Sequence, residues 1–109
     1  MKDSSQIIKE FAKAWETLNP ELIIANLDKA FVYDSQWVFE RLDYNEYIEY
    51  LRAKFKVIKD SNSAPSVNVV PDEYSGGLML SLQQGDNKPV FYRIKVSNGK
   101  VIKGDLCMF

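Results

Sequence analysis

Apolar residues recur at the spacing of an α-helix in the first part of the chain, over residues 4–18. The stripe consists of Ile7, Ile8, Phe11, Trp15 and Leu18. These positions share one face of a helix with about 3.6 residues per turn, and the charged residues between them fall on the other face. Asp3 and Gln6 are spaced as a capping box, so the pattern predicts an amphipathic helix that begins just after Asp3.

A short second helix and a long third helix follow. Pro20 is a typical helix start, because the N–H that proline lacks is not needed in the first turn, and the apolar residues behind it extend this helix to about residue 28. Asp43 and Glu46 are spaced as a second capping box, and the stripe behind them predicts a helix that ends near Lys59. That stripe consists of Tyr47, Ile48, Leu51, Phe55 and Ile58.

The remaining segments have the composition or the alternation of β-strands. The predicted strands cover residues 31–35, 37–41, 67–74, 78–83, 90–96 and a last segment after the Asn-Gly pair. The first two are rich in aromatic and β-branched side chains, and the later ones alternate apolar and polar positions, which indicates strands with one buried face. The third contains Pro71, which favours an edge position or a bulge.

The strongest local signal is Asn98-Gly99, because both residues tolerate the positive φ of a tight type I′ hairpin. Counting outward from this turn places Tyr92 opposite Asp105, and cross-strand partners share a face. The same count puts Lys103 on the apolar face. A bulge near Gly104 would change which of the following residues point inward, so the register of the last strand stays open at this point.

In chain order the predicted elements are α-α-β-β-α-β-β-β-β. Three helices from the N-terminal half and a curved, mainly antiparallel sheet wrapped around them make an α+β fold. A length of 109 residues fits a single domain over 1–109. Because three helices cover only part of such a sheet, we expect the uncovered concave part to form a pocket or a surface for a partner.

Composition narrows the chemistry that this fold could carry. The 14 Lys+Arg and 15 Asp+Glu residues give a net charge of −1 without a long basic run, which argues against nucleic acid as a partner. The sequence has no His, which excludes Ser–His and Cys–His nucleophile pairs, and its single Cys107 excludes a cysteine cluster for zinc or iron–sulfur. It has neither a Gly-rich phosphate loop nor EF-hand spacing, so no cofactor and no metal are expected. No apolar run suggests a signal peptide or a membrane span, so a cytoplasmic protein without membrane contact is expected.

The order of these elements also carries a resemblance. The long first helix with Ile7–Trp15, the strand Phe31–Asp34 and the C-terminal hairpin Asn98–Ile102 stand in an arrangement that resembles the NTF2-like superfamily, including SnoaL-like and ketosteroid-isomerase-like proteins. The resemblance implies a cone-shaped fold with an apolar pocket between sheet and helices, and a homodimer formed through the sheet. Its members include isomerases, cyclases, dehydratases and adaptors.

The resemblance implies candidate catalytic residues as well. Steroid isomerases of this superfamily move a proton with an Asp at the end of the first strand, where Asp34 falls if one preceding loop residue is deleted and Ser35 falls otherwise. Their two oxyanion donors correspond to Phe11, which cannot donate, and to Tyr92, so the set is incomplete. The candidate site is Asp34 as the base, with Tyr92 and Asp105 as donors. The alternatives are a turn-capping Asp34, a core Tyr92 and a solvent-facing Asp105.

A set of large side chains is the candidate lining of a pocket for a flat, apolar ligand. It comprises Phe11, Trp15, Trp37, Phe55 and Cys107. Such a set is more often plain core, and that alternative stays open. Two functions are therefore predicted: a pocket protein for an apolar or amphipathic small molecule, with proton transfer through Asp34 as an option, or a non-catalytic dimeric interaction domain. Buried acids in a cavity would favour the first function, and a cavity filled by side chains the second.

Overall fold

The computed structural model describes residues 2–35, 40–74 and 76–107. Its helices are α1 (Ser4–Thr17), α2 (Glu21–Ile24) and α3 (Tyr44–Ser61). Its strands are β1 (Leu27–Ser35), β2 (Leu42–Asp43), β3 (Ser66–Pro71), β4 (Leu78–Gln83), β5 (Val90–Ser97) and β6 (Lys100–Cys107). The order of helices and strands is the predicted one, and it confirms the α+β class.

Both long helices begin where their capping boxes predict. At the start of α1, the Asp3 side chain accepts a hydrogen bond from the backbone N–H of Gln6, and the Gln6 side chain accepts one from the backbone N–H of Asp3. Asp43 and Glu46 form the same pair of bonds at the start of α3. The apolar stripes behind these caps are largely buried, so the apolar spacing and the caps together place both helices.

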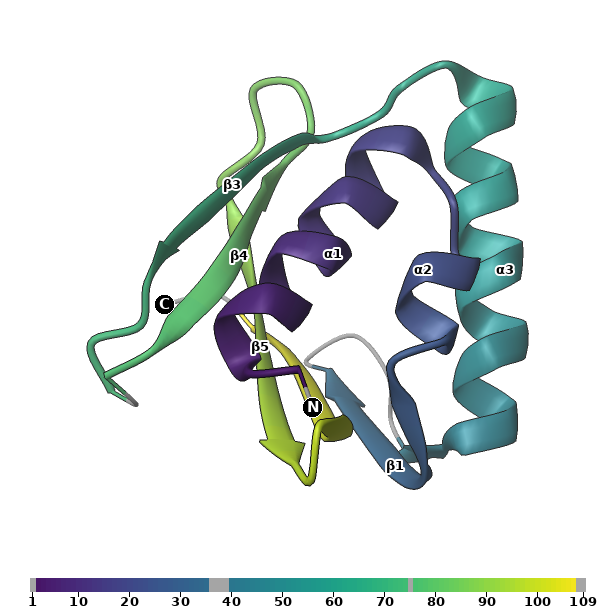
Figure 1. Cartoon of the computed structure of the whole chain (residues 1–109). Helices are drawn as coiled ribbons and strands as arrows, with labels where there is room; N and C mark the ends of the chain where they lie inside the picture. The colour runs from purple at the N-terminus through teal and green to yellow at the C-terminus, as the bar shows by residue number, and fades with distance from the viewer. Residues whose placement is uncertain (1, 36–39, 75, 108–109) are drawn as a thin grey trace.

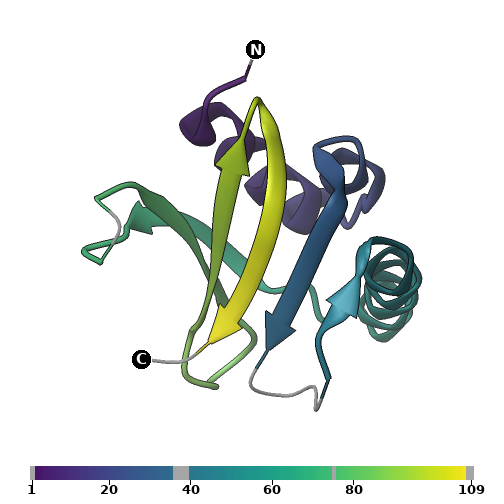
Figure 2. The same cartoon turned by 90° about the horizontal axis from the view of Figure 1, so that it is seen from below.

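The six strands form one sheet in the order β2-β1-β6-β5-β4-β3. β1 and β6 are parallel, and the other neighbouring pairs of described strands are antiparallel, which confirms a mainly antiparallel sheet. The sheet curves around α1, while α3 lies on the side of β1 (Figure 1). Figure 2 shows β6 between β1 and β5, at the centre of the sheet. We call the face toward α1 the inner face and the opposite face the outer face.

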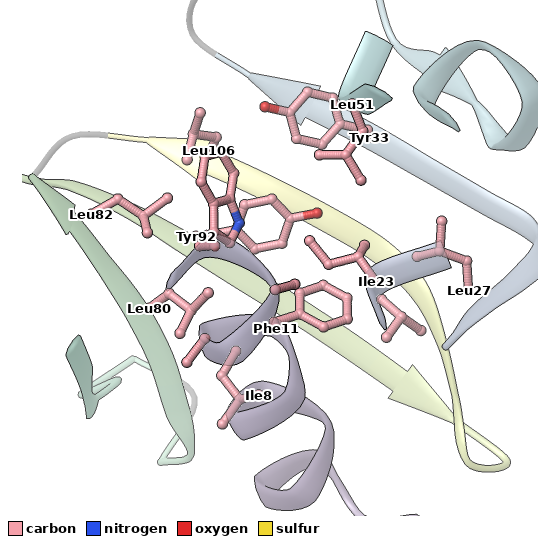
Figure 3. Close-up of a cluster of buried hydrophobic side chains, with 14 of the residues drawn as sticks. Ile8, Phe11, Ile23, Leu27, Tyr33, Leu51, Leu80, Leu82, Tyr92 and Leu106 are labelled. Carbon is pink, nitrogen blue, oxygen red and sulfur yellow. The ribbon is translucent and has the colours of Figure 1, made fainter. Parts of the chain in front are cut away.

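The core fills the space between α1, α3 and the inner face. Its largest fully buried side chains are Tyr33, Tyr47, Tyr92, Phe11, Phe31, Ile7, Ile8, Ile23, Leu51, Leu80 and Val101. Figure 3 shows Phe11 of α1 and Tyr92 of β5 close to one another within this core. Large aromatic rings from helix and sheet therefore meet at the centre of the cone.

The chain enters the sheet earlier than the apolar pattern predicts. α2 ends at Ile24 and β1 begins at Leu27, so the predicted longer helix is wrong. The cause is Asn26, whose buried side chain donates from Nδ2 to the carbonyl oxygen of Leu22 (2.8 Å). The carbonyl oxygen of Asn26 in turn accepts from the backbone N–H of Val101 in β6 (2.8 Å). These bonds end the helical segment and start the parallel pairing of β1 with β6.

Two further predicted strands differ from the structure. Positions 37–39 of the predicted strand over 37–41 lie outside the described residues; Glu40 and Arg41 are not in a strand, and the short β2 follows them. β3 lies at the edge of the sheet and ends at Pro71, in agreement with the edge position that a proline favours. Tyr74 was predicted in this strand but lies beyond it, in the turn toward β4.

The β5–β6 hairpin contains a bulge, at Ile102 rather than near Gly104. The pairs next to the turn are as predicted, but Ile102 is then an extra residue, and Lys103 moves to the outer face. Tyr92 consequently pairs with Leu106, and the predicted pairing of Tyr92 with Asp105 is wrong. The bulge removes a charged Lys103 from the apolar face and places Leu106, which is 4% exposed, in the core.

Candidate functional site

Three buried tyrosines occupy the interior between α3, β1 and β5: Tyr33, Tyr47 and Tyr92. The hydroxyl oxygens of Tyr47 and Tyr92 are hydrogen-bonded at 2.8 Å, and the ring centroids of Tyr33 and Tyr47 lie 4.6 Å apart. Burial raises the pKa of all three hydroxyl groups, so they stay protonated at neutral pH. This part of the interior is a packed aromatic core with its hydroxyl groups inside it.

A small pocket lies at the end of the molecule where α1 ends, beside the C-terminal half of α3 and the β4–β5 loop. This end is at the top of Figure 1. The pocket has a volume of about 130 Å³. Its apolar walls are Trp15, Ile58, Pro65, Leu82, Val90 and Leu106. Polar side chains of Lys54, Gln84, Asn87 and Lys88 complete the lining.

Trp15 of α1 and Lys54 of α3 face each other at this pocket. Trp15 is 4% exposed, and its ring meets the ring of Phe55 edge-on at 4.6 Å between centroids. Its buried indole Nε1–H has no hydrogen-bond acceptor in the described part of the chain. Lys54 Nζ lies 6.0 Å from the centroid of the Trp15 ring and 3.3 Å from the hydroxyl oxygen of Tyr50. The Lys54 ammonium group is therefore a hydrogen-bond donor at the edge of a small, largely apolar space.

The candidate ligand-binding residues do not all line this pocket. Trp15 lines the pocket, and Phe55 packs behind it without lining the pocket. Phe11 is fully buried with its ring against Tyr92, at 5.8 Å between centroids, so it belongs to the core. Cys107 pairs with a residue of β5 on the outer face, and burial raises the pKa of its thiol. Trp37 lies outside the described residues.

Asp34 forms ion pairs at the outer face. Its neighbour Tyr33 points into the core, and alternation along β1 turns Asp34 the other way. Both carboxylate oxygens accept from the guanidinium of Arg41 at 3.0 Å, and Lys103 Nζ lies 3.5 Å from Oδ2. The hydrogen bonds from Arg41 lower the pKa of the Asp34 carboxyl below its ordinary value. Burial in a pocket would raise the pKa of a carboxyl group, and the shift of Asp34 runs in the opposite direction.

The structure does not bring the three candidate catalytic residues together. Tyr92 points inward and its hydroxyl bonds to Tyr47, whereas Asp105 is opposite Arg93 on the outer face. Asp34 stands beside Asp105 on the neighbouring strand of that outer face. The sheet therefore separates the two carboxylates from the tyrosine hydroxyl and from the pocket.

The sequence indicated that Lys54 belongs to a solvated helix end, and neither Lys54 nor Tyr47 was predicted as a site residue. Lys54 lies four residues after Tyr50 and four before Ile58, a spacing that puts a charged residue on a partly apolar helix face. That signal was present in the sequence. Tyr47 was assigned to the apolar stripe, which is correct, but its hydrogen bond to Tyr92 depends on tertiary structure that the sequence does not display.

The structure also contains a buried ion pair on the outer face that was not predicted from the sequence. Asp72, which is 3% exposed, accepts from Arg93 Nε at 2.7 Å. The Arg93 guanidinium lies over the ring of Tyr74, so the β3–β4 turn folds onto this face. Within the described ranges of the chain, no group of three or more His, Cys, Asp or Glu side chains could hold a metal ion. No helix there has both the length and the apolar character needed to span a membrane.

No protein-family model and no curated protein matches the sequence. Solved structures do match. A SnoaL-like protein of unknown function from Burkholderia thailandensis is 15% identical with a TM-score of 0.72, covering 94% of this chain and 90% of that one. An NTF2-like protein of unknown function from Cytophaga hutchinsonii is 11% identical with a TM-score of 0.66, covering 97% and 89%.

A third similar structure is a protein with a ketosteroid isomerase-like fold from Catenulispora acidiphila, in complex with trimethylamine. It is 9% identical with a TM-score of 0.64, and covers 97% of this chain and 87% of that one. At such identities the likeness concerns the fold, and it agrees with the curved sheet, the helix order and the parallel β1–β6 pair described above. The chain therefore has the cone-shaped fold of NTF2-like proteins.

Proposed function

We propose that the protein binds a small, largely apolar molecule in the pocket beside Trp15. The observation that supports this proposal is a volume of about 130 Å³ with six apolar residues in its walls. An engineered cavity of about 150 Å³ holds benzene, so a ligand with one small ring matches the pocket in size. The Trp15 ring and the Leu82 and Leu106 side chains offer such a ligand dispersion contacts and release it from water.

The proposal is binding rather than proton transfer through Asp34. A carboxylate with a lowered pKa is a weaker base, and Asp34 lies on the opposite face of the sheet from the pocket. The tyrosine hydroxyl groups are in the core, with their pKa values raised, so they act as neutral donors to one another. This arrangement supports binding of a ligand, and we propose no reaction for it.

The test is a titration with neutral one-ring compounds such as toluene and benzyl alcohol, followed by NMR. We expect shifts of the Trp15 indole N–H signal and of the Leu82 and Leu106 methyl signals. Val90→Trp, which fills the pocket, should abolish these shifts, whereas Val69→Trp on the edge strand should leave them unchanged. Unshifted spectra with every compound, or shifts confined to other residues, would refute the proposal.

A second candidate function, a homodimer formed through the outer face, has its own support. Phe91 and Cys107 are paired on neighbouring central strands, and both are only half-buried in the single chain. We propose that a second copy covers this apolar strip. Sedimentation should then show a dimer at micromolar concentration that Phe91→Glu converts to a monomer. A monomeric wild-type protein would exclude this interface.

A further inference from the structure

We infer that the pocket beside Trp15 selects small carboxylates with an apolar body, such as benzoate. This inference rests on the proposed function and gives it a chemical class of ligand.

The charges at the pocket have one sign. Lys54 and Lys88 both line it, and none of the described residues that line it is acidic. Other cationic side chains, such as Lys2, Arg41 and Arg52, each form an ion pair with a carboxylate. Across the described ranges, no acidic side chain lies within ion-pair distance of Lys54 or Lys88. A net charge of −1 for the whole chain thus coexists with a local excess of positive charge at this pocket.

The ammonium group of Lys54 is held in place. It donates to the Tyr50 hydroxyl oxygen at 3.3 Å, and it lies over the rings of Tyr50 and Trp15, at 5.5 and 6.0 Å from their centroids. These contacts are with neutral groups, so they orient the cation without neutralising it. A carboxylate in the pocket would supply the missing counter-charge.

The indole N–H of Trp15 is a second donor in need of an acceptor. It is buried, and no described residue accepts from it. A buried donor without an acceptor is unfavourable, but this nitrogen has almost no accessible surface, so a ligand oxygen in the pocket does not reach it in this conformation. A carboxylate in the pocket is therefore expected to bind to the Lys54 ammonium, which lines the pocket and can form a charge-assisted hydrogen bond. The apolar walls would then contact the body of the ligand.

The experiment compares three probes that share a phenyl ring: benzoate, the neutral benzamide and the cationic benzylammonium. Affinities are measured by calorimetry and from the Trp15 indole signal. Because a charge-assisted hydrogen bond outweighs a neutral one, we expect benzoate to bind about tenfold tighter than benzamide. Benzylammonium should bind more weakly than either.

Two lysine variants test whether the charge of Lys54 causes the preference for benzoate over benzamide. Lys54→Met keeps much of the side-chain length but removes the charge, and it should weaken benzoate about tenfold while changing benzamide less than about twofold. Lys56→Met is the matched control, because Lys56 is exposed on the same helix and does not line the pocket. It should leave both affinities unchanged.

The outcomes distinguish a failure of the carboxylate preference from a failure of the proposed function. Equal affinity of the wild-type protein for benzoate and benzamide would overturn the carboxylate preference and leave the proposed function standing. Absence of binding by every phenyl compound would overturn both. The wild-type comparison needs no variant, so it decides the matter even if Lys54→Met fails to fold.

Discussion

At the scale of single residues, the most consequential contact is the hydrogen bond between the Tyr47 and Tyr92 hydroxyl groups. Both side chains are 1% exposed, so each hydroxyl depends on the other for its partner. The net gain from such a bond is modest, but removing one partner leaves the other buried and unsatisfied. The pair therefore constrains which aromatic residues can stand at these two positions.

This contact leads to a double-mutant cycle. Tyr92→Phe and Tyr47→Phe should each lower the free energy of unfolding by about 1–3 kcal/mol, because each strands a hydroxyl group in the core. The double variant, which strands none, should lose clearly less than the sum of the two single variants. Urea denaturation followed by circular dichroism measures all four proteins. Strict additivity would mean that the two hydroxyl groups do not depend on one another.

A second residue-scale feature is the ion pair of Asp34 with Arg41. The folded chain lowers the pKa of the Asp34 carboxyl below its ordinary 3.8, chiefly through the hydrogen bonds from Arg41. The pair therefore stabilises the fold at a pH above this ordinary value, and that contribution is lost as the pH falls through the lowered pKa. Because both partners are partly exposed, the effect on stability is small.

The pKa itself is a sharper measure of that pair. Arg41→Met should raise the pKa of Asp34 toward its ordinary value, as followed by carboxyl ¹³C NMR between pH 2 and 6, roughly the range over which Asp titrates. Lys103→Met should raise it less, since the contributions of Lys103 are smaller. An unchanged pKa in Arg41→Met would show that the ion pair does not form in solution.

At the scale of elements, the helices were predictable because their signals are local. A capping box occupies four consecutive residues, and an apolar stripe repeats within two turns, so Asp43 and the residues behind it specify α3 without tertiary information. The start of β1 was not predictable, since the bond from Val101 to Asn26 joins residues far apart in the chain. The bulge at Ile102 was missed for a related reason: the turn sequence fixes only the pairs next to it.

The cap of α3 provides the element-scale prediction. Asp43→Ala should lower the free energy of unfolding by about 1 kcal/mol, because the backbone N–H of Glu46 loses its acceptor. Asp60→Ala, at the opposite end of the same helix, is the matched control. There a negative charge opposes the helix dipole, so its removal should leave stability unchanged or slightly higher. Equal losses in both variants, measured by urea denaturation, would argue against a capping role for Asp43.

At the scale of the whole molecule, sheet sidedness explains why the candidate catalytic site could not be predicted. The sequence identified Tyr92, Asp34 and Asp105 as polar residues on strands, but their roles depend on which face each one occupies. A single extra residue in β6 reverses the face of every residue after it, and this moved Asp105 away from Tyr92. Trp15 does line the pocket, and its role in binding a ligand stays a prediction.

β6 lies very close to the core at Gly104, and this packing leads to a prediction for the whole molecule. A Cβ atom at Gly104 would lie 2.5 Å from the hydroxyl oxygen of Tyr92 and 3.0 Å from Phe31 Cζ. Gly104→Ala should therefore lower the free energy of unfolding by about 1–3 kcal/mol through overpacking. In a Tyr92→Phe background, where the nearest atom is gone, the same substitution should cost less. A neutral Gly104→Ala in thermal unfolding would contradict this packing.

The position of β6 also decides when the fold can form. Although it is the last strand in the chain, it lies between β1 and β5, so the sheet has no continuous centre before residues 100–107 are available. A nascent chain that ends at the hairpin turn would carry two strands with open edges and an uncovered apolar face, which favours aggregation. Folding of this sheet therefore waits for residues 100–107, and a fragment without β6 should depend on chaperones to stay in solution.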